Sequence, residues 1–376
     1  MSTFKNEFSN TNGQKNREKG SSQSSVTLNR AAEIALGDGH LTKAIQHANE
    51  ALELLIQETD ESHYINLAHN HLIHSKIYLA QKDFNQANNF VERGLQICEE
   101  RNFDKLISEG FLISGKISFF QKDYISAILY FLAARSKASS NQQAKQLTES
   151  ILFIGKVYTE VFHYEKALEN FRQLEINDEI QLDRSNQLGL LNYLGKAHFY
   201  LFQYDSAMIY FKEAEQLAQQ SNDKTALVFC QSYIGMIHAR QEEYNRALRY
   251  AKKVNHITEE IGDAYGLQIN LINLGNIHNK LEKYSEGIKL TSRGIAAAKR
   301  MKDGLSEIRG YQIMAEIFRK QKDYKSAVMY QMIYTKFYED FYQRNDRLKV
   351  IEIEYDYTIK QLRQQVEQLK KKQAQG

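Results

Sequence analysis

The feature that most constrains this chain of 376 residues is a sequence unit that returns every 40 residues. One slot holds a small residue: Ser75, Gly115, Gly155, Gly195, Gly235, Gly275 and Ala315. An aromatic residue follows nine positions later: Phe84, Tyr124, Tyr164, Tyr204, Tyr244, Tyr284 and Tyr324. A second small residue comes three positions after that: Ala87, Ala127, Ala167, Ala207, Ala247, Gly287 and Ala327. A fixed period of this kind is typical of a solenoid, in which each unit buries its apolar face only against its neighbours.

The pattern inside one unit predicts two amphipathic helices joined by a short link, here Phe202–Asp205. Two apolar stripes flank that link: Leu190, Leu191, Leu194 and Ala197, then Met208, Phe211, Ala214 and Leu217. The chain contains no proline, although average composition would give it roughly nineteen. Because proline in a helix costs about 3 kcal/mol, its absence favours an all-α fold, with a low-proline coding bias as the alternative.

The glycines indicate close packing between helices. Glycine inside a helix costs about 1 kcal/mol relative to alanine, so five glycines at one register need a packing explanation. We expect Gly195 and Ala207 to lie where the two helices of one hairpin cross. A larger side chain there would force the helix axes apart.

The order of these residues resembles the tetratricopeptide repeat, with its L-G-x2-Y…A-x3-F pattern. The match is fullest at Ile154-Gly155-x2-Tyr158 with Ala167-x3-Phe171. The period exceeds the family's usual value of about 34, and the proline that closes each repeat is missing. The chain is therefore similar to the long-helix subgroup, which includes bacterial regulators that sense signalling peptides. The resemblance implies an all-α, right-handed solenoid of helical hairpins.

We expect three segments. Residues 1–27 are polar, cannot bury enough surface to offset the entropy of ordering, and are predicted to be disordered. Residues 28–337 form about eight helix-pair repeats. Residues 338–376 continue as one helix that either caps the last repeat or pairs with a second copy as a coiled coil. The predicted dimer residues recur at three- and four-residue steps: Leu348, Ile351, Tyr355, Ile359, Leu362, Val366 and Leu369.

The resemblance implies that the first helix of every repeat lines a concave groove, and that residues just after the small slot face it. Four of these are lysines: Lys76, Lys116, Lys156 and Lys196. Helices pack about 8–10 Å apart and an extended peptide rises about 3.3 Å per residue, so acids at every third position could meet these lysines. An acidic partner segment is one interpretation, and a row of solvated lysines is the other.

Amides on the same helices form a second predicted set. Asn273 and Asn276 match positions at which related repeats hold a peptide backbone, and Asn192 lies one residue early. An amide both donates and accepts, so it can bind a peptide whatever its side chains are. The alternative is exposed asparagines of no function. Arg240 and Lys280, at the ends of these helices, complete the predicted groove.

Several classes of function are disfavoured. No catalytic signature is present, so we expect no enzyme and no cofactor. His71 and His74 share a helical face without a third ligand, and two distant cysteines argue against a disulfide framework, so no metal site is expected. The polar start lacks a signal peptide and no run of apolar residues could span a membrane, which predicts a cytoplasmic protein.

The sequence thus predicts a non-enzymatic scaffold or sensor in signalling that holds a protein or an extended peptide, with homodimerisation through the last helix as a further hypothesis. The alternative is a peptide-responsive regulator of a response regulator, similar to the Rap-type family. The three-helix bundle that this resemblance implies does not fit residues 1–27, which are too short and too polar. Nucleic-acid binding through residues 285–376 ranks third, because their excess of 19 Lys and Arg over 12 Asp and Glu is spread over both helix faces.

Overall fold

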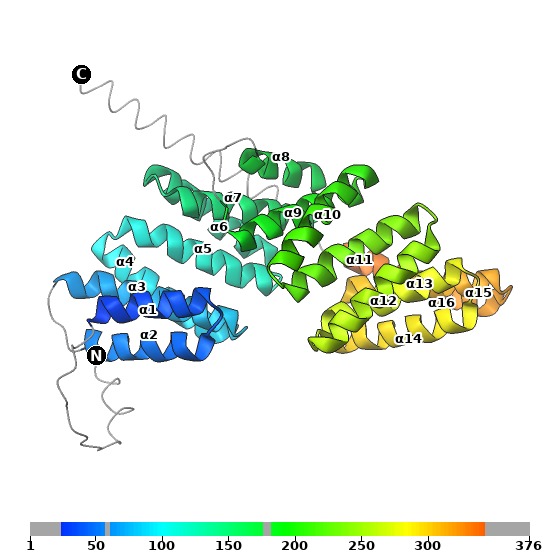
Figure 1. The fold of residues 1–376 in the computed structure, drawn as a ribbon, viewed down its shortest axis with the longest axis horizontal. Coiled ribbons are helices and arrows are strands. Elements are labelled where there is room, and N and C mark those ends of the chain that lie inside the picture. Colours follow the sequence, from blue (N-terminus) through cyan, green and yellow to red (C-terminus); the bar gives the residue numbers. More distant parts are fainter. Residues whose placement is uncertain (1–23, 57–60, 176–181, 343–376) are drawn as a thin grey trace, which may run out of the picture. The chain divides into compact units, whose positions relative to one another are not determined.

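Helices alone make up the regular structure of residues 24–56, 61–175 and 182–342, which are the residues that the computed structural model describes (Figure 1). The helices are α1 (Ser25–Gly37), α2 (Leu41–Leu55), α3 (Glu61–Ala80), α4 (Phe84–Arg101), α5 (Asp104–Phe120), α6 (Tyr124–Ser140), α7 (Ala144–Glu160), α8 (Tyr164–Glu175), α9 (Arg184–Tyr200), α10 (Tyr204–Gln220), α11 (Lys224–Arg240), α12 (Tyr244–Glu260), α13 (Ala264–Lys280), α14 (Tyr284–Met301), α15 (Gly304–Lys320) and α16 (Tyr324–Tyr342). The prediction of an all-α fold is confirmed. No helix in this part of the chain is both long enough and apolar enough to cross a bilayer.

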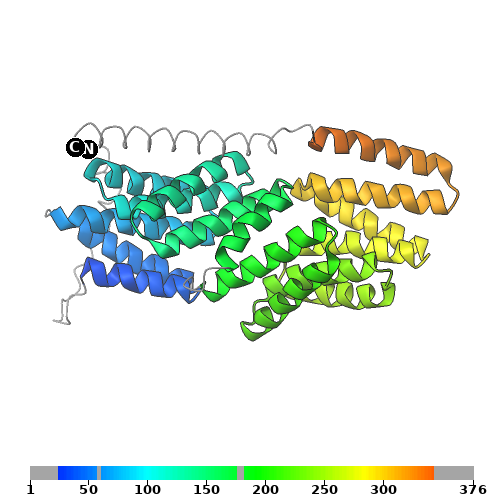
Figure 2. The same ribbon diagram turned by 90° about the horizontal axis from the view of Figure 1, so that it is seen from above.

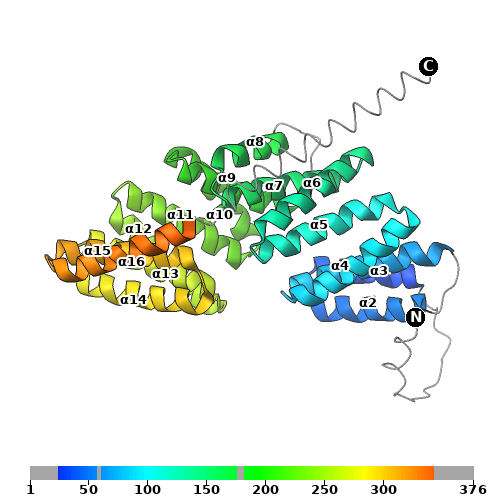
Figure 3. The same ribbon diagram turned by 180° about the vertical axis from the view of Figure 1, so that it is seen from behind.

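The chain divides into two units, residues 1–103 and residues 104–376. The first unit contains α1 to α4, and the second contains α5 to α16. In the second unit each helix packs on the next one along the chain. The odd-numbered helices, which are the first helices of the repeats, also pack on one another in order from α5 to α15. Figures 2 and 3 show this order of helix pairs from two further sides.

The turns repeat with the same period as the helices. The residue before the cap of each second helix has a left-handed backbone, as at Lys82 with φ 62° and Lys122 with φ 64°. An aspartate then caps the next helix at several turns: Asp123 accepts a hydrogen bond from the backbone N–H of Ser126, at 3.1 Å. Left-handed helix ends followed by a side-chain cap give a sharp, reproducible reversal of the chain. Local sequence therefore sets the hairpin geometry of each repeat.

The packing role of the glycines is confirmed, and at Gly115, Gly155 and Gly195 the residue they make room for is the phenylalanine of the A-x3-F pattern. A Cβ atom added at Gly195 would lie 2.8 Å from Cε1 of Phe211. The equivalent atom at Gly115 would lie 2.5 Å from Phe131. The rings of Phe131 and Phe211 are fully buried. Each ring therefore occupies the space that the missing side chain leaves.

Two predictions concern residues outside the described part of the chain. Most of the polar segment 1–27 belongs there, and helix α1 begins at Ser25. All of the predicted dimer residues, from Leu348 to Leu369, lie beyond Tyr342, the last residue of α16. The disorder of the N-terminal segment and the pairing of two copies through the last helix therefore remain predictions.

Candidate functional site

The second unit encloses an open cavity of about 930 Å³. Its walls come from the first helices α9, α11, α13 and α15, from the second helices α8, α12 and α16, and from the turns at Phe162, Phe202 and Glu242. A cavity of this volume is within the range that ligand sites in proteins occupy. We call it the groove cavity. Because successive first helices lie side by side in this unit, the cavity runs across several repeats.

Four of the predicted groove residues line this cavity: Arg240, Asn273, Asn276 and Lys280. Asn192 does not line it. The Asn192 side chain is buried in α9, and its Oδ1 atom accepts no hydrogen bond from the described residues. The structure therefore brings the amides of α13 to the cavity and leaves that of α9 in the packed interior.

Arg309 of α15 is a central residue of the cavity that the sequence analysis did not identify. Its Nη2 atom donates a hydrogen bond to Oδ1 of Asn273, at 3.0 Å, and lies 3.5 Å from the sulfur of Met236. One guanidinium thus contacts α11 and α13 from α15. Arginine does not recur at this position of the repeat, because the equivalent residues forty positions earlier and later are Ile269 and Lys349. The repeat pattern therefore gave no reason to single out Arg309.

The charges of the cavity differ in how far they are neutralised. Lys280 forms an ion pair of 2.8 Å with Glu316. Arg240 is exposed and forms no ion pair with a described residue. The lining also contains the carboxylates of Glu165 and Glu242. Among these charges, the unpaired guanidinium of Arg240 and the amide-bound guanidinium of Arg309 are the groups that suit a carboxylate of a ligand.

Aromatic side chains form the rim of the cavity. Phe162 and Phe202 have left-handed backbones, with φ 66° and φ 60°, and 76% of Phe202 is exposed. The same turn slot holds charged residues in five other repeats, namely Lys82, Lys122, Glu242, Glu282 and Lys322, and a glycine, Gly39, between α1 and α2. An exposed phenylalanine in a backbone conformation that favours small or polar residues is an outlier, and outliers of this kind gather at functional sites. The change from charged to aromatic residues in this slot was visible in the sequence, and our sequence analysis missed it.

The predicted lysine row faces the neighbouring first helices, and most of it is paired with glutamates. Lys116 bonds Glu149 at 2.5 Å, and Lys196 bonds Glu160 at 2.6 Å. In the first unit, Lys76 lies 3.3 Å from Glu33. The bond from His69, together with the charge of Lys76, lowers the pKa of Glu33 to about 2. These pairs link adjacent helices and reduce the positive charge that a ligand would meet.

Lys156 differs from the other lysines of this row. Its Nζ atom lies 4.3 Å from the ring centroid of Phe153 and 5.4 Å from that of Tyr193, and it forms no ion pair with a described residue. Burial, followed by repulsion from Lys116, lowers the pKa of Lys156 to about 8. Two aromatic faces therefore stand where the other lysines have a carboxylate.

His71 and His74 of the first unit both contact the ring of Phe90 and serve packing. The ring nitrogens of His74 lie 3.1 Å from the carbonyl oxygen of Asn70 and 3.0 Å from Oδ1 of Asn49. The His74 ring also stacks on Phe90, at 4.7 Å. Burial, followed by the charge of His74, lowers the pKa of His71 to about 4. Both nitrogens of His74 are therefore occupied by protein groups.

Comparison with known proteins yields structural matches only. No protein-family model and no curated protein matches the chain. A Rap protein solved in complex with competence and sporulation factor matches with a TM-score of 0.64 and 15% identity, covering 85% of this chain and 98% of that one. NprR in complex with its cognate peptide NprX matches with a TM-score of 0.57 and 15% identity, covering 89% and 99%.

A third match connects the fold to the repeat pattern. A signal-transduction ATPase from Pyrococcus horikoshii, with a tetratricopeptide repeat sensor, matches with a TM-score of 0.53 and 11% identity. The match covers 86% of this chain and 54% of that one. Identities this low establish the fold alone. The chain has the tetratricopeptide-type helical repeat fold that the 40-residue unit predicted.

Proposed function

We propose that this protein is a non-enzymatic, peptide-responsive sensor of the cytoplasm that binds an extended peptide in the groove cavity. The observation that carries the proposal is the make-up of the cavity wall. It combines the amides of Asn273 and Asn276, the cations Arg240 and Arg309, and the exposed Phe202 ring. Backbone, carboxylate and apolar groups of a peptide each have a complementary partner there.

The dimensions of the groove suit a short peptide. Four first helices, from α9 to α15, contribute to the cavity. With neighbouring helices about 9 Å apart, they span roughly 27 Å. An extended chain rises about 3.3 Å per residue, so the cavity matches a peptide of about eight residues. Two of the similar structures, the Rap protein and NprR, were solved with a signalling factor or a peptide bound, which supports this class of ligand.

The charges of the wall suggest where an acidic group would bind. Lys116 and Lys196 are already paired with glutamates, whereas Arg240 is not paired with any described residue. We therefore place the acidic group of the peptide, a side chain or the terminal carboxylate, at Arg240 and Arg309. This shifts the expected acidic contact from the lysine row to the cavity at α11 to α15.

The test is a selection of binding peptides from a degenerate library, followed by calorimetry on single variants. Phe202→Lys places in the turn the residue that Lys82 and Lys122 place there in other repeats, so the fold should be retained. We expect peptide affinity to fall about tenfold, because an aromatic anchor is lost. Asn276→Ala should weaken binding to a similar extent.

The matched control is Asn255→Ala on α12, a half-buried asparagine whose amide donates a hydrogen bond to Glu259 and which does not line the cavity. It should leave peptide affinity unchanged. If the library yields no binder, or if Asn255→Ala weakens binding as much as Asn276→Ala does, the groove is not the peptide site.

A second candidate is a regulator that passes the peptide signal to a response regulator through the first unit. Two observations favour it: the division of the chain at residue 103, and a match that covers 98% of the Rap protein. Hydrogen exchange of the full chain, with and without peptide, separates the two candidates. Changed protection in α1 to α4 supports transmission, and changes confined to α9–α16 support a sensor that acts in another way.

Pairing of two copies through residues 343–376 remains part of the proposal. The segment repeats apolar residues at three- and four-residue steps, as a coiled coil does. Leu362→Glu should convert a dimer into a monomer in sedimentation equilibrium while leaving peptide affinity intact. If the natural protein already has the mass of a monomer in this measurement, this part of the proposal is wrong.

A further inference from the structure

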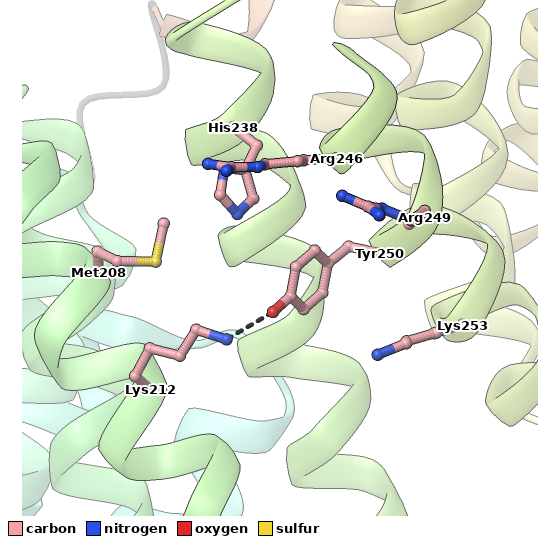
Figure 4. Close-up of a pocket in the computed structure, with 7 residues that line it drawn as sticks. All are labelled: Met208, Lys212, His238, Arg246, Arg249, Tyr250 and Lys253. Carbon is pink, nitrogen blue, oxygen red and sulfur yellow. Dashed lines mark hydrogen bonds between the residues drawn. The ribbon is translucent and has the colours of Figure 1, made fainter. Parts of the chain in front are cut away.

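A second cavity, of about 550 Å³, lies between helices α10, α11 and α12 (Figure 4). It shares no lining residue with the groove cavity. Met208 and Lys212 come from α10, His238 comes from α11, and Tyr250 comes from α12. Three further cations of α12 complete it: Arg246, Arg249 and Lys253. The peptide hypothesis makes no use of these residues.

Two of the cations in this cavity are not neutralised. Lys212 pairs with Glu215 at 2.8 Å, and Arg246 pairs with Glu243 at 2.8 Å. Arg249 and Lys253 form no ion pair with any described residue. Four cations thus face two carboxylates, and the excess charge lies on one face of α12.

The hydrogen bonds inside the cavity leave donors available. Lys212 donates to the hydroxyl oxygen of Tyr250, at 2.5 Å. That oxygen therefore acts as an acceptor, and its own O–H remains as a donor that no described residue accepts. Nζ of Lys253 lies 5.4 Å from the centroid of the same ring. In Figure 4 the side chains of Arg249 and Lys253 extend toward Tyr250 from one side, and Lys212 reaches it from the facing helix.

We propose that this cavity binds the phosphate group of an organic phosphate. The guanidinium of Arg249 and the ammonium of Lys253 extend from α12 beside the phenolic O–H of Tyr250, and Lys212 faces them from α10, so cations of two helices line one space that suits a tetrahedral group with three acceptor oxygens. A planar carboxylate needs only the fork of one arginine. The apolar wall made by Met208 and the Tyr250 ring offers contact to the organic part of the ligand.

The next repeat provides a comparison within the same chain. Forty residues after Arg249 and Lys253 stand Lys289 and Arg293, which are again two cations on one helix face. The slots of Arg246 and Tyr250 hold Glu286 and Leu290 there, and Glu286 lies 3.7 Å from Lys289. Helix α14 therefore has two cations at the same spacing, without the hydroxyl of Tyr250 and without the third cation that Arg246 provides. This makes it a matched control surface.

The experiment is calorimetry on the full chain with three probes: pyrophosphate, adenosine monophosphate and a phosphoserine peptide. We expect saturable binding of at least one probe at one site per chain. The double variant Arg249→Gln with Lys253→Gln should weaken that binding by about tenfold or more, because two charge-assisted contacts are lost. The double variant Lys289→Gln with Arg293→Gln should leave it unchanged.

The probes separate the sources of the phosphate. Preference for adenosine monophosphate identifies a free nucleotide, and preference for the phosphopeptide identifies a modified protein segment. Thermal unfolding of both double variants checks that each is folded. The proposal is overturned if no probe binds at millimolar concentration, if citrate or a glutamate-rich peptide binds as tightly, or if both double variants weaken binding equally. If duplex DNA binds more tightly than every probe, the proposal is also overturned, and these cations belong to a nucleic-acid-binding surface.

Discussion

In three repeats the glycine of the small slot and the phenylalanine sixteen residues later share one space: Gly115 with Phe131, Gly155 with Phe171 and Gly195 with Phe211. Gly195→Ala would place a methyl group 2.8 Å from the Phe211 ring. We expect the free energy of unfolding to fall by about 1–2 kcal/mol, since overpacking outweighs the better helix propensity of alanine. Urea denaturation measures the change.

Two controls accompany this prediction. An added Cβ at Gly37, the last residue of α1, meets no atom within 4 Å, so Gly37→Ala should have little effect. Phe211→Leu shortens the opposing side chain, so the double variant should be more stable than the sum of the two single effects predicts. Additive effects would show that the two residues do not share one space.

Lys156 is predicted to cost stability rather than provide it. Because burial and the charge of Lys116 lower its pKa from 10.5 to about 8, the folded state disfavours the charged form. Below pH 8 both the folded and the unfolded chain are protonated, and the whole cost is present. As pH rises from 8 toward 10.5 the unfolded chain binds more protons than the folded one, so the stability of the natural protein rises.

Lys156→Met should therefore stabilise the protein at pH 7 by about 1 kcal/mol, a value reduced from the full shift because the side chain is half-buried and contacts two rings. The advantage should shrink above pH 8. Lys116→Met is the matched control, since it leaves the buried Glu149 without its partner and should destabilise the fold. A destabilised Lys156→Met protein would show that the aromatic contacts outweigh the cost of burial.

At the scale of single residues, the repeat register predicted some contacts and missed others. It placed Arg240, Asn273, Asn276 and Lys280 on one surface, and the structure brings these four to one cavity. It did not predict the glutamates that pair with the lysines. Lys116 bonds a residue 33 positions later and Lys196 one 36 positions earlier. Partners at such variable offsets depend on helix packing, which no local pattern encodes.

At the scale of helices and turns, the aspartate caps contribute unequally. Asp223 is exposed and caps α11 through the N–H of Ala226. Asp303 is buried and accepts hydrogen bonds from Ser306 and from Gln268 of α13, at 2.7 Å and 2.8 Å, in addition to capping α15. One carboxylate therefore caps a helix and joins two repeats.

Asp303→Ala should lower the free energy of unfolding by about 2–3 kcal/mol, because it removes a cap and leaves the buried Gln268 amide without its acceptor. Asp223→Ala should cost only about 1 kcal/mol. Guanidinium denaturation of both variants measures the difference. Equal losses would mean that the link between α13 and α15 adds nothing beyond capping.

Element boundaries were largely predictable because turn and helix share the 40-residue period. The aromatic residue of the repeat begins a second helix each time from Phe84 to Tyr324. The left-handed turn residues were not predictable by type, since Lys122, Phe162 and Glu242 all adopt the same conformation. Their backbone geometry comes from the helix ends that they join. Their side chains are therefore free to differ, and at Phe162 and Phe202 they line the groove cavity.

At the scale of the molecule, the repeat determines the fold and the departures from the repeat determine the sites. The fold follows from positions that recur in the repeats, such as the two small-residue positions that Gly195 and Ala207 occupy. The two cavities depend on residues that no other repeat holds in the same slot, such as Arg309 and Arg249. A solenoid tolerates such substitutions because each repeat packs only on the neighbouring repeats. Sequence alone could therefore predict the repeat fold but not which residues line the two cavities.

The most direct test of the central claim, a peptide held in the groove cavity, is photo-crosslinking of a selected peptide to the full chain. A photoreactive phenylalanine analogue would replace Met236 in the cavity or, as a control, Lys289 on α14. We predict that the peptide crosslinks at position 236 and not at position 289, with attachment confirmed by mass spectrometry. Crosslinking at position 289 alone, or equal crosslinking at both, would contradict the account.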